Sequence, residues 1–360
     1  MLDFDFYPFS DNLIASSSED TTIKLWEIPE GGLASVITTP AGELLGHGRK
    51  VTLIKFHPTA SNVLGSISAD QTVKIWDIEK CAEINSLNDA HKELIQDFAW
   101  DYNGNRYATS SKDKAIRLVD ARSATLTGVV ENAHEGTKSV KLTFLGNFDR
   151  FASVGFSRSS MRQLKIWDPR NLATELTRVD LDNAAGAIMP FFDPDTNLLF
   201  LAGKGDGNVR SYEVNGDDQV TPMSEFRSSV SAKGMAVVPK RGLNVLGNEV
   251  ARLLKLTTNS VEPLSFIVPR KSDGFQEDIF PDTFSGEPSH TADDWVSGSD
   301  QPPQLTKLNP AAGATSPSSR TASRIASFRS ASSLQTELDK AQARIKELED
   351  RLQAAGLNID

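Results

Sequence analysis

Short strands with alternating apolar and polar residues fill most of the first 268 positions. The runs VTLIKFHP, NVLGSISAD and QTVKIWDI follow one another, and turn-forming residues separate them. A period of two residues is typical of β-strands with one buried face, and no helical period competes with it there. The pattern predicts an all-β chain up to about residue 268.

The same strand pattern recurs along the chain at a nearly constant interval. Its equivalent positions are Trp26, Trp76, Val119, Trp167 and Tyr212, which lie 50, 43, 48 and 45 residues apart. Repeats of about 40–45 residues are typical of WD-repeat propellers, in which each repeat forms one four-stranded blade. We therefore expect a WD-repeat β-propeller in residues 1–268 with about six blades. The sixth is weaker, with strands expected near GMAVVP, LNVLG, VARLLKLT and EPLSFIVP.

Two repeats contain a polar set that could be mistaken for a catalytic triad. The second has His47, Ser68, Asp70 and Trp76, and the third has His91, Ser111 and Asp113. We expect the aspartate to hold a tight turn, and the histidine, serine and indole N–H to form a buried network. Because the set recurs once per repeat without a nucleophile elbow, we interpret it as structural and predict that the chain is not an enzyme.

The composition changes after residue 268. Residues 269–308 are acidic and turn-rich but contain Phe275, Phe280, Phe284 and Trp295, so we expect an extension that packs its aromatic rings on the propeller. Residues 309–332 are predicted to be a Ser-rich basic linker. In this linker Ser323, Ser327 and Ser332 each follow an arginine by three positions, which makes them candidates for basophilic kinases; the alternative is an unmodified Ser-rich tether.

A third pattern begins at Leu334. Apolar residues occupy alternating heptad positions over three heptads, which predicts a coiled coil in residues 333–356. Ser332 and Gln335 can form a capping box at its start. Arg344 and Glu349 have the spacing of an interhelical ion pair around the core residues Ile345 and Leu348, so these four are the candidate oligomerisation residues. A single amphipathic surface helix is the alternative.

Charge and residue usage exclude several classes of function. The chain of 360 residues has a net charge of −10, so we expect no nucleic-acid binding, and any acidic partner must meet a local basic patch. It has no apolar run long enough for a transmembrane segment, and it lacks a secretion signal, which predicts a cytoplasmic protein. The five histidines are scattered and Cys81 is the single cysteine, so we expect no metal, no cofactor and no disulfide.

Several longer segments resemble the coronin family of actin-binding WD-repeat proteins. They are GFSRSSMRQLKIWD, PFFDPDTNLLFLAGKGDGNVRSYEV, VPKRGLNV and VPRKSDGFQEDIFPDT, and the resemblance covers about residues 2–308. It implies a seven-bladed propeller that binds actin filaments, works with the actin-related-protein branching complex and filament-severing factors, and acts in the actin cytoskeleton at the cell cortex. The hexad that begins at Arg344 is similar to the coronin trimerisation motif, which implies a parallel homotrimer. No Gly-His pair precedes LDFDFYPFSDNLIASSSED, so we expect the chain to open inside a blade and to lack about one N-terminal blade.

The resulting hypothesis is an actin filament-binding cytoskeletal regulator that oligomerises through its coiled coil and modulates actin branching and turnover. A WD-repeat scaffold for a different cytosolic complex is the alternative, and an enzyme with a pocket on the propeller face is the weakest. Basic candidates for actin contact are Arg49, Lys50, Arg158, Arg162, Lys240, Arg241, Arg270 and Lys271. We favour the last four, because they cluster in the last blade and its exit.

Overall fold

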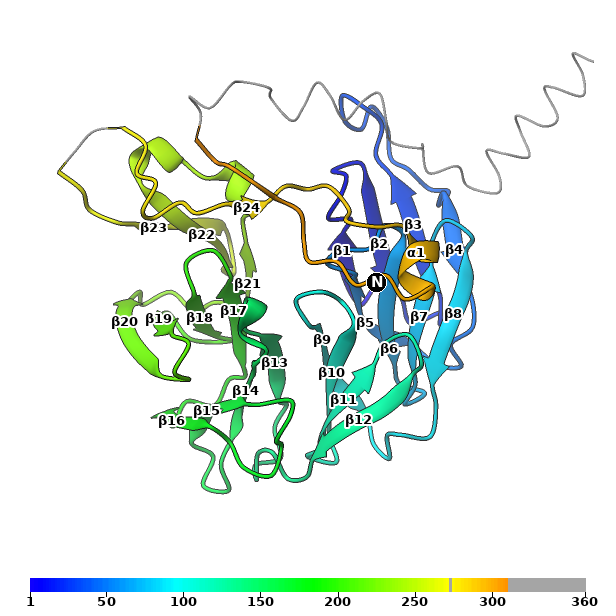
Figure 1. The fold of residues 1–360 in the computed structure, drawn as a ribbon, viewed down its shortest axis with the longest axis horizontal. Helices are drawn as coiled ribbons and strands as arrows, with labels where there is room; N and C mark the ends of the chain where they lie inside the picture. The colour runs from blue at the N-terminus through cyan, green and yellow to red at the C-terminus, as the bar shows by residue number, and fades with distance from the viewer. Residues whose placement is uncertain (272–273, 310–360) are drawn as a thin grey trace, which may run out of the picture.

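Six antiparallel sheets stand side by side around a common axis in the computed structural model, which describes residues 1–271 and 274–309 (Figure 1). The first five sheets have four strands each, in chain order, and the sixth has three. The all-β WD-repeat propeller predicted from the repeats is therefore confirmed. Residues 310–332 of the predicted linker and the predicted coiled coil of residues 333–356 lie outside the described residues. Within the described part of the chain, no helix has the length and apolar character needed to span a membrane.

The strands follow the repeats closely. Sheet 1 contains β1 (Asp3–Phe6), β2 (Leu13–Ser17), β3 (Ile23–Glu27) and β4 (Gly42–Leu44). Sheet 2 contains β5 (Val51–Phe56), β6 (Val63–Ser68), β7 (Val73–Asp77) and β8 (Ala82–Leu87). Sheet 3 contains β9 (Ile95–Trp100), β10 (Arg106–Ser111), β11 (Ile116–Asp120) and β12 (Thr125–Val130). Sheet 4 contains β13 (Lys141–Phe144), β14 (Phe151–Phe156), β15 (Arg162–Trp167) and β16 (Thr177–Asp182). Sheet 5 contains β17 (Ile188–Asp193), β18 (Leu198–Gly203), β19 (Val209–Val214) and β20 (Val220–Phe226). Sheet 6 contains β21 (Gly234–Val237), β22 (Glu249–Leu256) and β23 (Val261–Ile267).

The apolar core is divided among the junctions between consecutive sheets. The first strands β1, β5, β9, β13 and β17 contact one another in turn and form the inner wall of the propeller. Five apolar clusters fill the five junctions from sheet 1 to sheet 6. Every residue of β6 and β7 is buried, because both faces of a middle strand are covered by neighbouring sheets.

Two details of the sheets differ from the sequence expectations. The chain does not open inside a blade, since residues 3–44 form a complete four-stranded sheet. A Gly-His pair lies in the loop before an inner strand, so its absence removes no strand. The prediction of a strand near LNVLG is wrong, because Val245–Gly247 forms a 3-10 turn. The side chain of Asn244 caps this turn at its start, and the turn ends at Asn248, whose backbone is in the left-handed region. These turn residues outweigh the short apolar alternation.

We call residues 268–309 the extension. Its described residues, 268–271 and 274–309, run out from sheet 6 and return as a hairpin across the sheets (Figure 1). Its legs pair through β24 (Thr283–Phe284) and β25 (Leu305–Thr306). The tip carries the short helix α1 (Ala292–Val296), which begins with a capping box between Thr291 and Asp294. Trp295 of this helix is fully buried in the apolar cluster between sheets 2 and 3, so the tip completes that core.

A buried histidine on sheet 2 prepares the docking site for this tip. His57 accepts the backbone N–H of Ala60 at 2.8 Å and donates to the carbonyl of Gly104 at 2.8 Å. Gly104 is required here, because a Cβ atom at this position would lie 2.0 Å from the imidazole. The extension joins this arrangement where the backbone N–H of Ser289 donates to the carbonyl of Thr59 at 2.8 Å. His57 thus orders the backbone to which this part of the extension binds.

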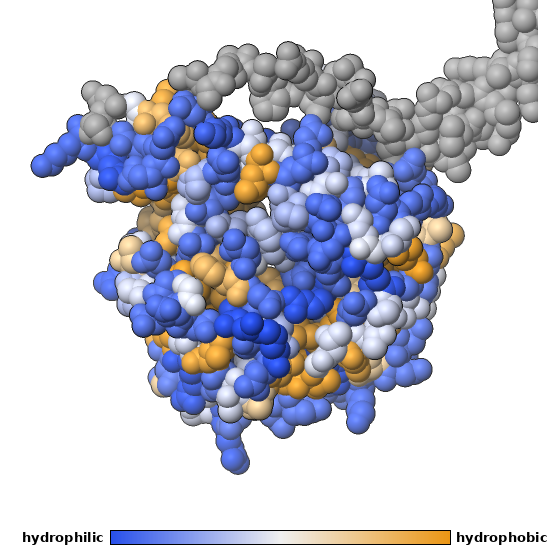
Figure 2. Space-filling model, in the orientation of Figure 1, coloured by the Kyte–Doolittle hydropathy of each residue, from blue (hydrophilic) through white to orange (hydrophobic). Residues whose placement is uncertain are grey.

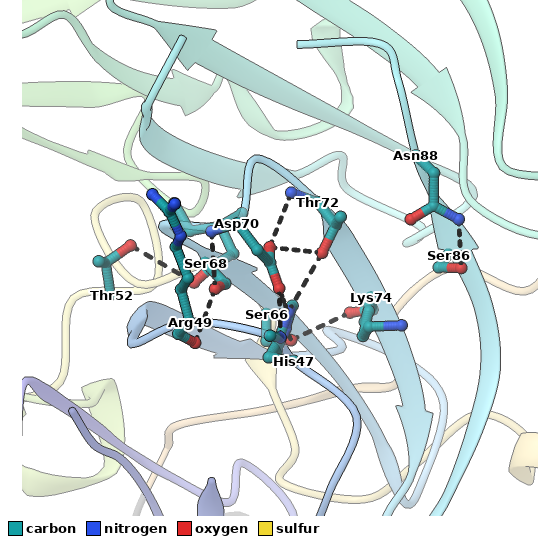
Figure 3. A network of polar contacts seen from close by, with 12 residues as sticks. His47, Arg49, Thr52, Ser66, Ser68, Asp70, Thr72, Lys74, Ser86 and Asn88 are labelled. Carbon is teal, nitrogen blue, oxygen red and sulfur yellow. Dashed lines mark hydrogen bonds and ion pairs between the residues drawn. The ribbon is translucent and has the colours of Figure 1, made fainter. Parts of the chain in front are cut away.

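The polar network of the second repeat uses a different serine from the predicted one (Figure 3). The hydroxyl of Ser66, not Ser68, lies 2.8 Å from both His47 Nε2 and Trp76 Nε1. His47 Nδ1 donates to the carboxylate of Asp70 at 3.0 Å. Ser66 and Ser68 share one face of β6, but Ser68 is nearer the turn, where its hydroxyl donates to the carbonyl of Arg49 at 2.9 Å.

The network varies in the other repeats. In the third, His91 contacts Thr109 at 3.3 Å instead of Ser111, and Asp113 forms an ion pair with Arg117 instead of contacting the histidine. In the fourth, Ser153 lies 2.8 Å from both His134 and the Trp167 indole nitrogen. A histidine imidazole bonded to a strand hydroxyl is therefore the shared feature, and it fixes the loop before each inner strand to its own sheet.

We expect Ser66→Ala to lower the free energy of unfolding by about 1–3 kcal/mol, because a buried indole N–H and an imidazole nitrogen lose their common partner. Ser16→Ala is the matched control, since Ser16 accepts from Trp26 at 2.8 Å but both residues are only half-buried. Water can replace that bond, so the control should cost less than about 1 kcal/mol. Urea unfolding of both variants measures the two losses. Equal losses would contradict the buried role of Ser66.

The buried histidines should make the protein less stable in mild acid. Burial lowers the pKa of His57 and His134 to about 3 and that of His91 to about 4. Because an unfolded histidine has a pKa of about 6.5, the unfolded chain binds more protons below that pH, and stability decreases as the pH falls from about 6.5 toward 3. His134→Gln, which does not titrate, should reduce the stability difference between about pH 7.5 and pH 5 by roughly 1–2 kcal/mol. Urea unfolding at both pH values tests this, and an unchanged difference would refute it.

Candidate binding surface

The two ends of the propeller strands form two chemically different faces. We define the top face as the loops that lead into the inner strands together with the turns between second and third strands. The bottom face contains the loops that leave the inner strands and carries the extension (Figure 1). The loop Gly46–Lys50 precedes β5 and belongs to the top face. The loop between β21 and β22, with Lys240 and Arg241, belongs to the bottom face.

Arg49 and Lys50 are exposed on the top face, and neither side chain has an ion-pair partner among the described residues. Their backbone is held firmly. The carbonyl of Arg49 accepts from Ser68, and the carbonyl of Lys50 accepts the backbone N–H of Ala69 at 2.9 Å. The hydrogen-bond network of the second repeat thus holds the loop that carries both cations, and Figure 3 shows the contact between Arg49 and Ser68.

The four favoured basic candidates do not form such a free patch. Lys240 is largely buried, with its ammonium nitrogen 2.5 Å from the carboxylate of Asp193 and 2.6 Å from the carbonyl of Val250. Arg241 pairs with Asp11 of sheet 1 at 2.5 Å, and Arg270 pairs with Asp278. Lys271 is exposed at the end of the first described range. The structure therefore places Arg49 and Lys50 on the opposite face from Lys240 and Arg241. Contact of any of these residues, or of Arg270 and Lys271, with actin stays a prediction.

Arg162 is not a surface residue. It begins β15 with only 2% of its side chain exposed, and its guanidinium contacts the carboxylates of Asp182 at 2.6 Å and Asp206 at 2.7 Å. These contacts lie between sheets 4 and 5. A buried, fully paired arginine holds the junction together and is not available to a partner.

A second group of basic residues surrounds a cavity of about 640 Å³ on the top face between sheets 3 and 4. Lys114, Lys138 and Arg158 line it together. Lys114 occupies the left-handed turn position after Asp113, with φ of 70°, and its ammonium group donates to the carbonyl of Glu135 at 2.7 Å. This turn geometry directs the lysine over the neighbouring loop.

Lys138 and Arg158 complete the cavity from sheet 4. Lys138 lies 4.6 Å from the centre of the Phe156 ring and donates to the carbonyl of Ala185 at 2.9 Å. Arg158 is exposed, and no described carboxylate pairs with it. Gly136 lets the loop approach Phe156, because a Cβ atom at position 136 would lie 2.6 Å from the Cβ of Phe156. Glu135 also lines the cavity, but none of the three cations forms an ion pair with a carboxylate among the described residues.

The rest of the top face strengthens this positive character. Two of its aspartates are paired with arginines, Asp113 with Arg117 and Asp206 with Arg162, whereas Asp70 only accepts a hydrogen bond from His47, whose pKa is lowered by burial. Basic side chains there that have no ion-pair partner among the described residues are Arg49, Lys50, Lys92, Lys112, Lys114, Lys138, Arg158, Lys204 and Lys233. The unpaired acids on the same face are Glu19, Asp89, Glu93, Glu131 and Glu135. The excess of free bases suits this face to an anionic partner.

Lys114 and Lys138 were missed as candidate binding residues in the sequence. A usable signal was present: Lys114 follows the turn residue Asp113, and Lys138 follows His134 by four positions. Aligning the repeats on these markers would have placed both lysines on the same face as Arg49. Within the described residues, no group of three or more His, Cys, Asp or Glu could hold a metal ion.

Comparison with protein families identifies the repeats. The family described as "WD domain, G-beta repeat" matches residues 2–27, 38–77 and 82–120, and "Type of WD40 repeat" matches residues 261–303. A crystal structure of the WD40 domain from Toxoplasma gondii coronin superposes with a TM-score of 0.83 at 31% identity, covering 86% of this chain and 80% of that chain.

Curated relatives carry the same family name over most of the chain. Coronin-A of Dictyostelium discoideum is 47% identical over 309 residues, which cover 86% of this chain and 68% of the relative. Human Coronin-2A is 41% identical, with 86% of this chain and 60% of the relative covered. Coronin-like protein crn1 of Schizosaccharomyces pombe is 42% identical, with 86% and 52% covered. The chain thus spans between about half and two thirds of the length of these relatives, and on this similarity of sequence and fold it belongs to the coronin family.

Proposed function

We propose that this chain binds actin filaments through its top face and acts as a cytoskeletal regulator at the cell cortex. Actin is the partner that coronin-family resemblance implies. The observation that supports this face is the convergence of Lys114, Lys138 and Arg158 on one cavity without a bound carboxylate. A chain of net charge −10 needs such a local basic surface to approach an acidic patch on a filament.

The loops that present these cations are ordered before binding. His134 and Ser153 fix the loop that carries Lys138, and the pairing of Asp113 with Arg117 fixes the turn that carries Lys114. Little conformational freedom is lost when such loops meet a partner, so more of the contact energy contributes to affinity. Arg49 and Lys50 would extend the same surface toward sheet 2.

We further propose that the chain works as a homotrimer and modulates actin branching and turnover with the actin-related-protein branching complex. The support is the heptad pattern of residues 333–356 and its coronin-like hexad. Three propellers on one coiled coil could contact a filament at more than one point. Such multivalency raises apparent affinity by about 10²–10⁴ when the geometry allows simultaneous contact.

The first test reverses charge on the two faces separately. A triple variant with Lys114→Glu, Lys138→Glu and Arg158→Glu should bind filaments at least about tenfold more weakly in co-sedimentation, with the wild-type salt dependence reduced. The matched control changes the same amount of charge at three exposed residues outside the top face: Arg170→Glu, Arg241→Glu and Lys271→Glu. The control should bind nearly as well as wild type. The opposite order of affinities would move the filament contact to the bottom face.

The second test concerns assembly. Arg344→Ala should shift the full chain from trimer toward monomer in sedimentation-velocity ultracentrifugation, because it removes the predicted interhelical ion pair and the stem that covers the seam. Lys346→Ala is the control, since Lys346 falls at an outward-facing heptad position and should leave the trimer intact. A monomeric wild type, or a trimer that tolerates Arg344→Ala, would contradict the proposal.

A further inference from the structure

Three hollows join end to end along the bottom face beside the extension. The largest, of about 360 Å³, shares Pro194, Asp195 and Leu305 with a second of about 130 Å³. The second shares Pro281 and Asp282 with a third of about 200 Å³. We call this continuous depression the extension groove. Figure 2 shows the face that carries it, where apolar and polar residues are interspersed.

The largest hollow is walled mainly by rings. The loops that leave the inner strands of sheets 1 to 5 all contribute, and the extension forms the remaining wall. Its principal apolar residues are Trp100, Tyr102, Phe144, Phe192, Phe284 and Leu305. Rings of this kind accept an aromatic or branched apolar side chain, and their faces also attract a guanidinium group.

Carboxylates line the groove beside these rings. Asp195 touches the first two hollows and Asp282 the second and third, and neither has an ion-pair partner among the described residues. Asp195 is half-buried, receives a hydrogen bond from the hydroxyl of Thr283, and has its pKa raised by that burial. Glu277 adds a further acid at the third hollow, against one base, Lys307. The groove therefore suits a ligand with apolar side chains flanked by cations.

We propose that the extension groove binds residues 320–329 of the same chain. This segment reads RTASRIASFR, so it carries Arg320, Arg324 and Arg329 with no acidic residue. Phe328 enters the ring-lined hollow, and the arginines meet Asp195 and Asp282. Ile325 is three residues from Phe328 and can cover the adjacent apolar wall.

The position of the segment in the chain favours it over an external peptide. Asn309 lines the third hollow, and ten residues, 310–319, lie between it and Arg320. A coil of that length has a root-mean-square end-to-end distance of about 17 Å. A tether this short gives an effective concentration in the millimolar range, so even a weak contact would be well occupied.

Phosphorylation should control this contact. Ser323 and Ser327 lie between the arginines of the segment. A phosphate on either would add about −1.5 to −2 charge beside Asp195 and Asp282, and repulsion would expel the segment. The predicted kinase sites would then switch the tail between a docked and a released state, independently of the filament-binding face.

Photo-crosslinking of the full chain tests the proposal. With p-benzoyl-phenylalanine at position 328, irradiation followed by mass spectrometry should give crosslinks to the walls around Trp100, Phe192 or Leu305. Asp195→Lys with Asp282→Lys should reduce these crosslinks at least about fivefold, as should Ser323→Asp with Ser327→Asp. Glu19→Lys, an exposed charge reversal on the top face, should leave them unchanged.

Two controls keep the result interpretable. Because Asp195 is half-buried, thermal unfolding of its variant is compared with wild type, and the exposed Asp282→Lys alone must still reduce crosslinking. Mixing ¹⁵N-labelled and unlabelled chains before assembly distinguishes partners. Crosslinks between heavy and light chains would overturn the proposal in favour of a second copy. Crosslinks elsewhere, or crosslinks indifferent to the charge reversals, would also overturn it.

Discussion

The sheets of this propeller have apolar faces, and each such face is stabilised when a neighbouring sheet covers it. The five clusters meet this requirement on both faces of sheets 2 to 5 and on one face each of sheets 1 and 6, and every residue of β6 and β7 is buried as a result. This packing buries the faces of the sheets but leaves the loops at the ends of the strands exposed. Function must therefore reside in the loops at the two ends, and the buried histidine networks exist to hold those loops in fixed positions.

The sequence predicted the sheets well because strand alternation and the repeat interval are local properties. Contacts between repeats were less accessible. The pairing of Lys240 with Asp193 joins residues 47 positions apart in different sheets, and that of Arg241 with Asp11 joins the sixth sheet to the first. Neither partner can be identified from periodicity. Lys240 and Arg241 are therefore adjacent bases in the sequence, but in the fold each is already in an ion pair.

Errors of detail have equally specific causes. Ser66 and Ser68 point to the same face of one strand. The position of the His47 imidazole along that strand decides which of the two hydroxyls it contacts. At LNVLG, the cap by Asn244 and the left-handed Asn248 outweigh the apolar alternation. Lys114 and Lys138 looked like ordinary surface charges until two neighbouring sheets brought them to one cavity. Their importance depends on the packing of two repeats, which neither repeat encodes alone.

The extension also determines how the molecule bears mechanical load. Because the described residues of the extension cross from sheet 6 to sheets 2 and 3 and return, a pull on the chain after Asn309 does not act on sheet 6 directly. The load reaches first the β24–β25 pairing and then the tip, where Arg122 holds the carbonyl of Trp295 at 2.6 Å and the indole is fully buried. Tension from an attached assembly would thus act on the contacts of the extension before it acts on the sheets.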